Sequence, residues 1–207
     1  MRTSVWLVRH GQTRHNLERR YLSHSDSPLT AYGEAQTRAL AERLRRIPFG
    51  VAIASPSGRT RLAAQAIVAG RRGVTVVEDP AWVEVDHGRW EGLTYREVQA
   101  RYPDEARARW AAGPDGRAAG GESLAEAAAR VTAAWGALLR DHRGGRVLVA
   151  THATPIQLVL CACLGLPPAE HWRWRIDLGS VTCVDVYGGG AIVRMVNDVP
   201  AIRRDEG

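Results

Sequence analysis

Two histidines in this sequence each follow a short apolar segment. Residues 4–8 lead into Arg9 and His10, and residues 146–150 lead towards His152. Apolar runs of this length are typical of buried strands, and ligands of open α/β sheets bind at the carboxyl ends of the strands. A pair of imidazoles with a guanidinium beside them could bind and attack a phosphoryl group, because imidazole is a nucleophile and guanidinium pairs bidentately with phosphate.

A second arginine is expected at the same edge. Residues 50–54 form another apolar segment, and Ser55-Pro56 predicts an N-cap followed by proline at the first helical position, which puts Arg59 in the first turn of a helix. Helix amino termini add free N–H groups and a partial positive charge. The cations would bind a phosphate dianion and lower the pKa of a nearby imidazole, so that His10 stays neutral and nucleophilic near neutral pH.

Strand-like and helix-like segments alternate along most of the chain. Further strands are predicted at residues 74–78, 181–187 and 191–196. Further helices are predicted to follow the N-caps Thr30, Ser123 and Thr154, with a capping box of Ser123 and Glu126 and with Gly165 ending the last helix. This order predicts an α/β fold with three α/β/α layers, a mainly parallel central sheet and a single domain over residues 1–207. Residues 79–122 interrupt the alternation, and we expect a small irregular cap there that lies over the carboxyl edge of the sheet.

The composition is that of an ordinary globular protein with a basic balance. The net charge is +6 and the pI about 9.9, but all 28 basic residues are scattered arginines without a nucleic-acid-binding motif. No nucleic-acid partner is therefore expected. The most apolar segment, residues 156–166, has the length of a core helix and not of a membrane span. Cys161, Cys163 and Cys183 form no Cys-x-x-Cys motif and predict reduced thiols in a cytoplasmic protein.

Several segments carry a more specific signal in combination. Arg9-His10-Gly11-Gln12-Thr13, followed by Asn16, matches the pattern Arg-His-Gly-x-Thr-x-x-Asn. Further matching segments are residues 25–36, 55–60, 84–92, 120–123 and 151–156. Together they resemble the motifs of the histidine phosphatase superfamily, in its phosphoglycerate-mutase-like branch, over about residues 4–160. The resemblance implies covalent chemistry at a phosphoryl group.

The resemblance also implies a role for each matched residue. His10 would attack phosphorus, and Glu84 would protonate the leaving oxygen and later deprotonate the attacking water. The phosphoryl oxygens would be held by Arg9, Arg59, His152, Asn16 and the Ala153 amide. The rest of the substrate would contact Gln12, Tyr21, Ser23 and the loop around Trp90. Neither a metal nor another cofactor is expected, because the arginines supply the positive charge.

Some of these residues have a second interpretation. Asp86 and Glu91 follow Glu84 closely in the sequence, and either could be the acid in its place. His152 could cap a helix. The remaining histidines are expected to be solvated or structural: His15, His24, His87, His142 and His171.

The segment after Glu91 enters a short helical stretch and lacks the longer insertion of phosphoglycerate mutases. In this it resembles the small phosphatases, such as alpha-ribazole phosphatase and the broad-specificity phosphatases. The sequence therefore predicts a metal-independent phosphomonoesterase for a small phosphorylated metabolite, with a homodimer as the candidate assembly. Two alternatives stay open. One is a phosphoglycerate mutase, and the other is a regulatory binding protein, which the presence of His10, Arg9, Arg59 and His152 disfavours.

Overall fold

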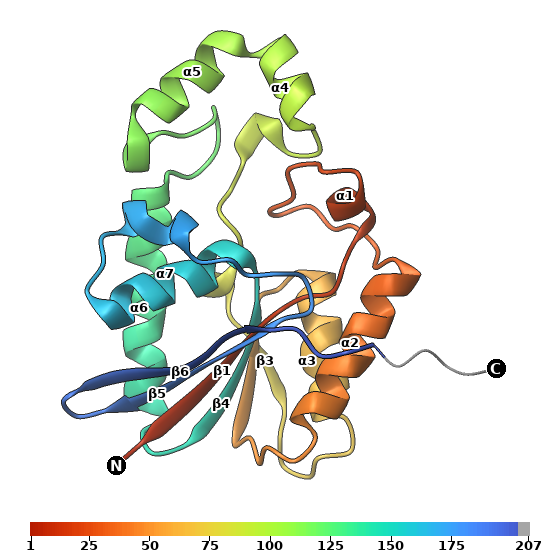
Figure 1. Cartoon of the computed structure of the whole chain (residues 1–207), viewed down its shortest axis with the longest axis vertical. Helices are drawn as coiled ribbons and strands as arrows, with labels where there is room; N and C mark the ends of the chain where they lie inside the picture. The colour runs from red at the N-terminus through yellow and green to blue at the C-terminus, as the bar shows by residue number, and fades with distance from the viewer. Residues whose placement is uncertain (203–207) are drawn as a thin grey trace.

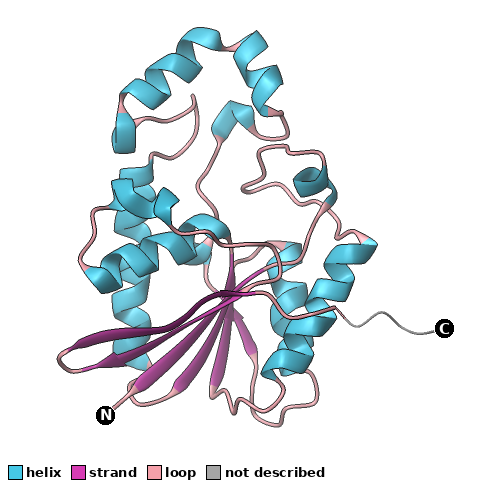
Figure 2. Ribbon diagram, viewed as in Figure 1, coloured by secondary structure: helices cyan, strands magenta, loops and turns pink. Residues whose placement is uncertain are grey.

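The computed structural model describes residues 1–202, which contain one six-stranded sheet (Figures 1 and 2). The strands are β1 (Thr3–Arg9), β2 (Val51–Ala54), β3 (Val76–Glu78), β4 (Arg146–Thr151), β5 (Val181–Tyr187) and β6 (Gly190–Asp198). Their spatial order is β3-β2-β4-β1-β5-β6, in which β1 to β4 are parallel and the hairpin of β5 and β6 is antiparallel. The mainly parallel sheet is confirmed. Residues 203–207 of the predicted domain lie outside the described part.

Helices cover both faces of the sheet (Figure 1). They are α2 (Ala31–Leu44) and α3 (Gly58–Val68) on one face, and α6 (Leu124–Asp141) and α7 (Ala153–Leu164) on the other. A hydrophobic core lies on each face of the sheet, and the central strand β1 contributes to both. Val5 and Leu7 pack on the α6 and α7 side, and Trp6 and Val8 pack on the α2 and α3 side. Successive strand residues point to opposite faces, so one continuous apolar run fills two cores. The three predicted layers are confirmed.

The start of α3 differs from the prediction. The helix begins at Gly58 with Ser57 at the N-cap, and not at Ser55. The hydroxyl of Ser55 instead lies 2.9 Å from Nε2 of His152, a partner far away in the sequence. Arg59 nevertheless lies in the first turn of α3, as predicted.

The start of α7 also differs. The helix begins at Ala153 with His152 at the N-cap, so Thr154 is already helical and Pro155 is the third helical residue. Proline is tolerated there because the first four N–H groups of a helix have no partner within it. The end at Gly165, which adopts a left-handed conformation, agrees with the prediction.

The cap, residues 79–122, is more regular than predicted. It contains α4 (Tyr95–Arg101) and α5 (Pro103–Ala111), which lie apart from the sheet beyond the carboxyl ends of its strands (Figure 1). A small core of Trp90, Val98, Ala106 and Ala118 holds the two helices together.

Short helical turns complete the fold, inside and outside the cap: α1 (Arg14–Leu17), η1 (Pro80–Trp82), η2 (Gly88–Trp90), η3 (Gly113–Asp115) and η4 (Pro168–Arg173).

Within residues 1–202, none of the helices is both long enough and apolar enough to cross a membrane. The three cysteines are free thiols. Cys161 and Cys183 are buried, and Cys163 is partly buried. The most apolar helix, α7, packs its buried residues into the sheet core as expected.

Candidate active site

Four residues singled out from the sequence meet at the carboxyl edge of the sheet. β1 and β4 are parallel neighbours in which Arg9 is paired with Thr151, so His10 and His152 leave adjacent strands side by side. Their ring centroids are 5.2 Å apart, and both rings are buried. Arg59 reaches the same point from the first turn of α3 and is 1 % exposed. The topology therefore gathers two imidazoles and two guanidiniums in one buried cluster.

The hydrogen bonds of His10 define which of its nitrogens is free. Nδ1 lies 2.8 Å from the carbonyl oxygen of Gly11, and a carbonyl can only accept. Nδ1 therefore carries the proton, and Nε2 keeps a lone pair. Burial, reinforced by the charges of Arg59 and Arg9, holds the pKa of His10 well below its ordinary value of 6.5. The ring is thus a neutral imidazole with an available nucleophilic nitrogen.

His152 has the complementary arrangement. Its Nδ1 lies 3.4 Å from a guanidinium nitrogen of Arg59, which can only donate, so Nε2 donates to the hydroxyl of Ser55 at 2.9 Å. Burial and then Arg59 lower its pKa well below 6.5. The residue occupies the N-cap position of α7 but makes no side-chain capping bond. The alternative interpretation of His152 as a helix cap therefore does not account for its ring.

The lowered histidine pKa values predict a pH-dependent stability. The unfolded chain titrates its histidines near pH 6.5, whereas folded His10 and His152 bind protons only at lower pH. The unfolded state therefore binds more protons below about pH 6.5, and the free energy of unfolding falls as the pH drops from about 7 to 6. Urea unfolding at both pH values measures the change. Equal stability at the two pH values would contradict the buried neutral rings.

Both arginines keep one buried donor without a partner. Arg9 donates to the carbonyl of Ile176 at 2.7 Å, and Arg59 donates to the carbonyls of Ser23 at 2.7 Å and Ser25 at 2.9 Å. Their Nε atoms have no hydrogen-bond partner among residues 1–202. A buried unpaired donor is costly, so these N–H groups, together with the amino terminus of α7, suit an anionic oxygen ligand.

Glu84 lines the same cavity as Arg9, and its charge partly offsets the lowering of the pKa of Arg9 and Arg59 that burial causes. Its Oε1 accepts from the Val85 amide at 2.9 Å, and its Oε2 accepts from the Thr154 amide in the first turn of α7 at 3.3 Å. The other two candidate acids are engaged elsewhere. Asp86 accepts from the Gly88 amide at 2.8 Å, and Glu91 binds the loop of residues 23–25. The geometry thus favours Glu84 among the three.

A cavity of about 380 Å³ opens beside the cluster and shows where a ligand would enter. Its lining includes Arg9, Asn16, Tyr21, Glu84 and Thr154. Asn16 is held by Thr13, whose amide and hydroxyl donate to its side-chain oxygen at 3.1 and 2.9 Å. The Ala153 amide, at the first position of α7, lies next to His152 in the chain.

The cap adds two residues that the sequence did not single out as contacts. His87, which was expected to be solvated or structural, lines the cavity and lies against Tyr21 with ring centroids 4.8 Å apart. An adjoining cavity of about 420 Å³ shares Tyr21, His87 and Thr154 and also reaches Arg109. The Arg109 guanidinium lies over the Trp90 ring at 4.7 Å. No local sequence pattern marks either residue, because only the folded cap brings them to the site.

Two predicted substrate contacts do not line this cavity. The side-chain oxygen of Gln12 accepts from Thr30 at 2.9 Å. Ser23 is 1 % exposed, and its hydroxyl donates to Glu91. Both side chains are thus occupied by internal hydrogen bonds. Tyr21 is the only one of the three that the structure places in the cavity wall within residues 1–202.

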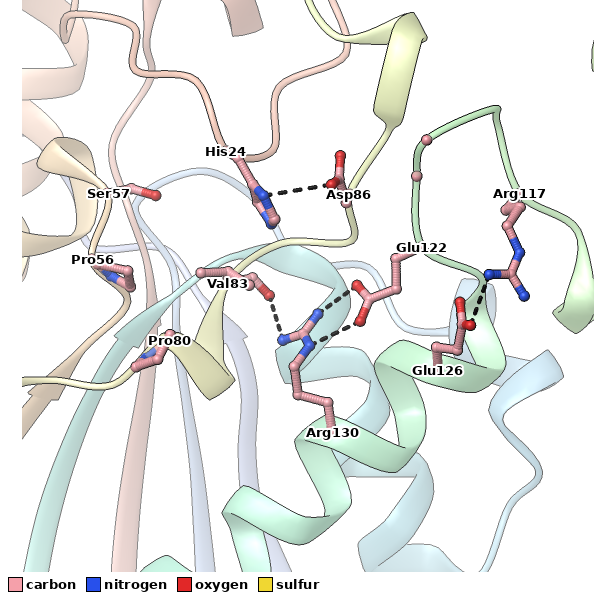
Figure 3. A pocket seen from close by; sticks show the side chains of 12 residues that line it. His24, Pro56, Ser57, Pro80, Val83, Asp86, Arg117, Glu122, Glu126 and Arg130 are labelled. Carbon is pink, nitrogen blue, oxygen red and sulfur yellow. Dashed lines mark hydrogen bonds and ion pairs between the residues drawn. The ribbon is translucent and has the colours of Figure 1, made fainter.

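A second cavity, of about 650 Å³, is lined by Val83 and Asp86, which flank Glu84 in the same loop (Figure 3). Arg130 of α6 spans its floor, donating to the carbonyl of Val83 at 3.0 Å and to both oxygens of Glu122 (Figure 3). Arg117 likewise pairs with Glu126 at 2.8 Å, and the His24 ring lies 3.6 Å from Asp86. Arg130 therefore anchors the loop next to Glu84. The arginines and glutamates of this cavity wall are already paired with one another.

Comparison with known proteins places these residues in a family context. A model described as the histidine phosphatase superfamily (branch 1) matches residues 5–199. The chain is 36 % identical over 203 residues to a probable phosphoglycerate mutase of Enterobacter sp. (strain 638), covering 94 % of this chain and 93 % of the relative. It is 33 % identical over 192 residues to phosphoserine phosphatase 1 of Hydrogenobacter thermophilus, covering 92 % and 90 %.

Solved structures show the same fold. The alpha-ribazole phosphatase of Shigella flexneri superposes with a TM-score of 0.89 and 25 % identity, covering 99 % of this chain and 100 % of that one. A mycobacterial glucosyl-3-phosphoglycerate phosphatase in complex with VO3 gives a TM-score of 0.83 and 25 % identity, covering 94 % and 99 %. The relatives thus include both a probable mutase and phosphatases.

Proposed function

Because this chain belongs to the histidine phosphatase superfamily (branch 1), we propose that it is a metal-independent phosphomonoesterase for a small phosphorylated metabolite, acting through a phosphohistidine at His10. The main support is the tautomer of His10, whose Nδ1 proton is fixed by Gly11 and whose Nε2 is free. The unpaired Nε donors of Arg9 and Arg59 add support, since both can bind phosphoryl oxygens.

In the first step, the Nε2 lone pair of His10 forms a bond to phosphorus while the ester P–O bond breaks. A protonated Glu84 gives its proton to the leaving oxygen. Arg9 and Arg59 bind phosphoryl oxygens and stabilise the charge that develops on them, and His152 joins them by turning its Nε2–H from the Ser55 hydroxyl to a phosphoryl oxygen. The Nδ1–H bond to Gly11 stabilises the positive charge that the phosphorylated ring acquires.

In the second step, the Glu84 carboxylate takes a proton from a water molecule whose oxygen attacks phosphorus. The N–P bond breaks, and its electron pair returns to Nε2 of His10, so the free enzyme is regenerated with phosphate as the product. Arg9, Arg59 and His152 do not change protonation state in either step. A bound cation is not needed for charge balance, because two guanidiniums face the phosphoryl group. No cluster of metal ligands is found among residues 1–202.

A phosphoglycerate mutase is the second candidate, favoured by one observation in the cap. Among the described residues, the side chain of Arg109 makes no ion pair or hydrogen bond, although its guanidinium lies at the cavity that adjoins the site. A free cation in the adjoining cavity would suit a second anionic group on the substrate. Hydrolysis is favoured because the cavity beside Glu84 is open to solvent, so water can reach a phosphoenzyme.

Phosphate release from a panel of phosphomonoesters, with and without EDTA, tests the proposal. We expect turnover that EDTA does not diminish. A parallel assay of phosphoglycerate interconversion, primed with 2,3-bisphosphoglycerate, tests the mutase. Interconversion that is faster than phosphate release would replace the phosphatase assignment, and turnover abolished by EDTA would overturn its metal independence.

The proposal includes a cytoplasmic location and a homodimer. The three free cysteine thiols support the location, since a reducing compartment keeps thiols unpaired. The nine-residue strand β6 at one edge of the sheet supports a dimer, because an edge strand offers unpaired backbone groups to a second copy. Light scattering of the purified chain measures the assembly.

A further inference from the structure

Glu91, which follows the short helix η2 in the cap, is bound to a loop on the other side of the site. Its two carboxylate oxygens accept from the Ser23 amide at 2.9 and 3.0 Å and from the Ser25 amide at 3.2 Å. The hydroxyls of Ser23 and Ser25 donate to the same carboxylate. Four donors from two residues thus converge on one negative charge, so this segment is held by a single side chain of the cap.

The same two serines determine the orientation of Arg59. Their carbonyl oxygens accept from the two terminal guanidinium nitrogens of Arg59, at 2.7 Å for Ser23 and 2.9 Å for Ser25. Each serine therefore donates to Glu91 through its amide and accepts from Arg59 through its carbonyl. The two bonds hold both terminal nitrogens of the guanidinium in place, whereas its Nε has no partner among residues 1–202.

Further bonds join the cap to this loop. The Tyr21 amide donates to the Leu93 carbonyl at 2.9 Å, and the Gly92 amide donates to the Tyr21 carbonyl at 2.9 Å. Trp90, next to Glu91, is fully buried in the cap core. The position of Glu91 is therefore set by the folded cap, and a displacement of the cap would reach Arg59 through the two serines.

We propose that Glu91 is a positioning residue for Arg59: through Ser23 and Ser25 it orients the guanidinium for the phosphoryl group and couples the cap to the phosphate site. This inference rests on the proposed function, since it assigns Arg59 to the phosphoryl oxygens. Glu91 is not the general acid, because both of its oxygens are already occupied by the four donors.

The negative charge of Glu91 is needed for this arrangement. Burial alone would raise its pKa, but the bonds from the side chains and amides of Ser23 and Ser25 outweigh burial and lower the pKa below its ordinary value. A glutamine in its place would turn an amide NH2 towards donors and leave at least one of them unpaired. The loop, and with it Arg59, would then lose its fixed geometry.

Glu91→Gln tests the proposal through inhibition by vanadate, which mimics the phosphoryl group in its transition state. We expect about a tenfold lower kcat/KM and about a tenfold weaker inhibition by vanadate, because a displaced guanidinium binds the transition state less well. Glu105→Gln is the matched control. Glu105 is also a cap carboxylate that accepts from a backbone amide, that of Ala119, and from Arg89, but it does not touch the loop. We expect it to change vanadate inhibition less than about twofold.

A double-mutant cycle with Arg59→Lys separates positioning from simple support of the cap. If Glu91 acts through Arg59, Glu91→Gln costs less than about twofold in kcat/KM once Arg59 is already lysine. An equal loss in both backgrounds, or unchanged vanadate inhibition in the single variant, would overturn the inference. Circular dichroism confirms folding of each variant, and Glu91→Asp replaces Glu91→Gln in the same cycle if the glutamine variant does not fold. A wild-type chain that hydrolyses no phosphomonoester would instead overturn the proposed function.

Discussion

His10→Ala lowers kcat/KM for every phosphomonoester by about 10⁴-fold or more, because it removes the atom that bonds to phosphorus. The remaining groups, Arg9, Arg59 and His152, still bind the phosphoryl oxygens, so substrate affinity changes far less than turnover. In the wild type, mixing with substrate and quenching in base, where phosphohistidine is stable, should trap a phosphoryl group on the peptide that contains His10. Mass spectrometry of that peptide measures the intermediate.

The control for this variant is a histidine outside the site. His142 lies at the carboxyl end of α6, and His142→Ala should retain wild-type turnover. The buried ring of His10 also contributes to packing, so thermal unfolding of His10→Ala must show a folded protein before its activity is interpreted. Turnover within tenfold of the wild type in a folded His10→Ala protein would rule out the phosphohistidine mechanism.

The buried cluster could be predicted from the sequence because simple rules place each member. Arg9, His10 and His152 directly follow apolar strands, and parallel strands bring their carboxyl ends to one edge. The pairing of Arg9 with Thr151 then makes the two histidines neighbours. Arg59 was placed correctly although its helix begins later than predicted. The predicted start at Pro56 and the observed start at Gly58 both leave Arg59 in the first turn of α3.

The helix starts could not be predicted because distant residues decide them. Ser55 has the sequence features of an N-cap, but its hydroxyl is bound by His152, which lies between β4 and α7. Local preference for a cap is worth about 1 kcal/mol, and a buried hydrogen bond to a neighbouring element can outweigh it. By contrast, Ser123 and Glu126 form the predicted capping box, because both partners lie within the same helix.

The cap was the least predictable part for a related reason. α4 and α5 have seven and nine residues, too few for a clear helical period, and their apolar residues pack on each other and on Trp90. The side chains that the cap contributes, His87 and Arg109, reach the site only after this packing has formed. The bond between Glu91 and the serines joins segments 66 to 68 residues apart, which no spacing rule could anticipate.

Glu84→Gln should slow both chemical steps, but to different extents for different esters. General acid–base catalysis contributes about 10²-fold or more, so kcat/KM for alkyl phosphates should fall by about that factor. p-Nitrophenyl phosphate has a leaving group that needs no proton, and the first step with this ester should be nearly unaffected. The second step still needs a base to deprotonate water, so the phosphoenzyme should accumulate.

Pre-steady-state kinetics distinguish these effects. With p-nitrophenyl phosphate, Glu84→Gln should release a burst of p-nitrophenol followed by slow turnover, because dephosphorylation of His10 has become rate-limiting. Asp86→Asn is the matched control, since Asp86 lies on the same loop and was one of the two alternative acids. Its carboxylate accepts from the Gly88 amide, lies 3.6 Å from His24 and lines the second cavity. We expect neither a burst nor a dependence on the leaving group in that variant. A burst in Asp86→Asn and none in Glu84→Gln would reassign the general acid to Asp86, and the contact between Glu84 and the first turn of α7 would then serve only to hold the loop.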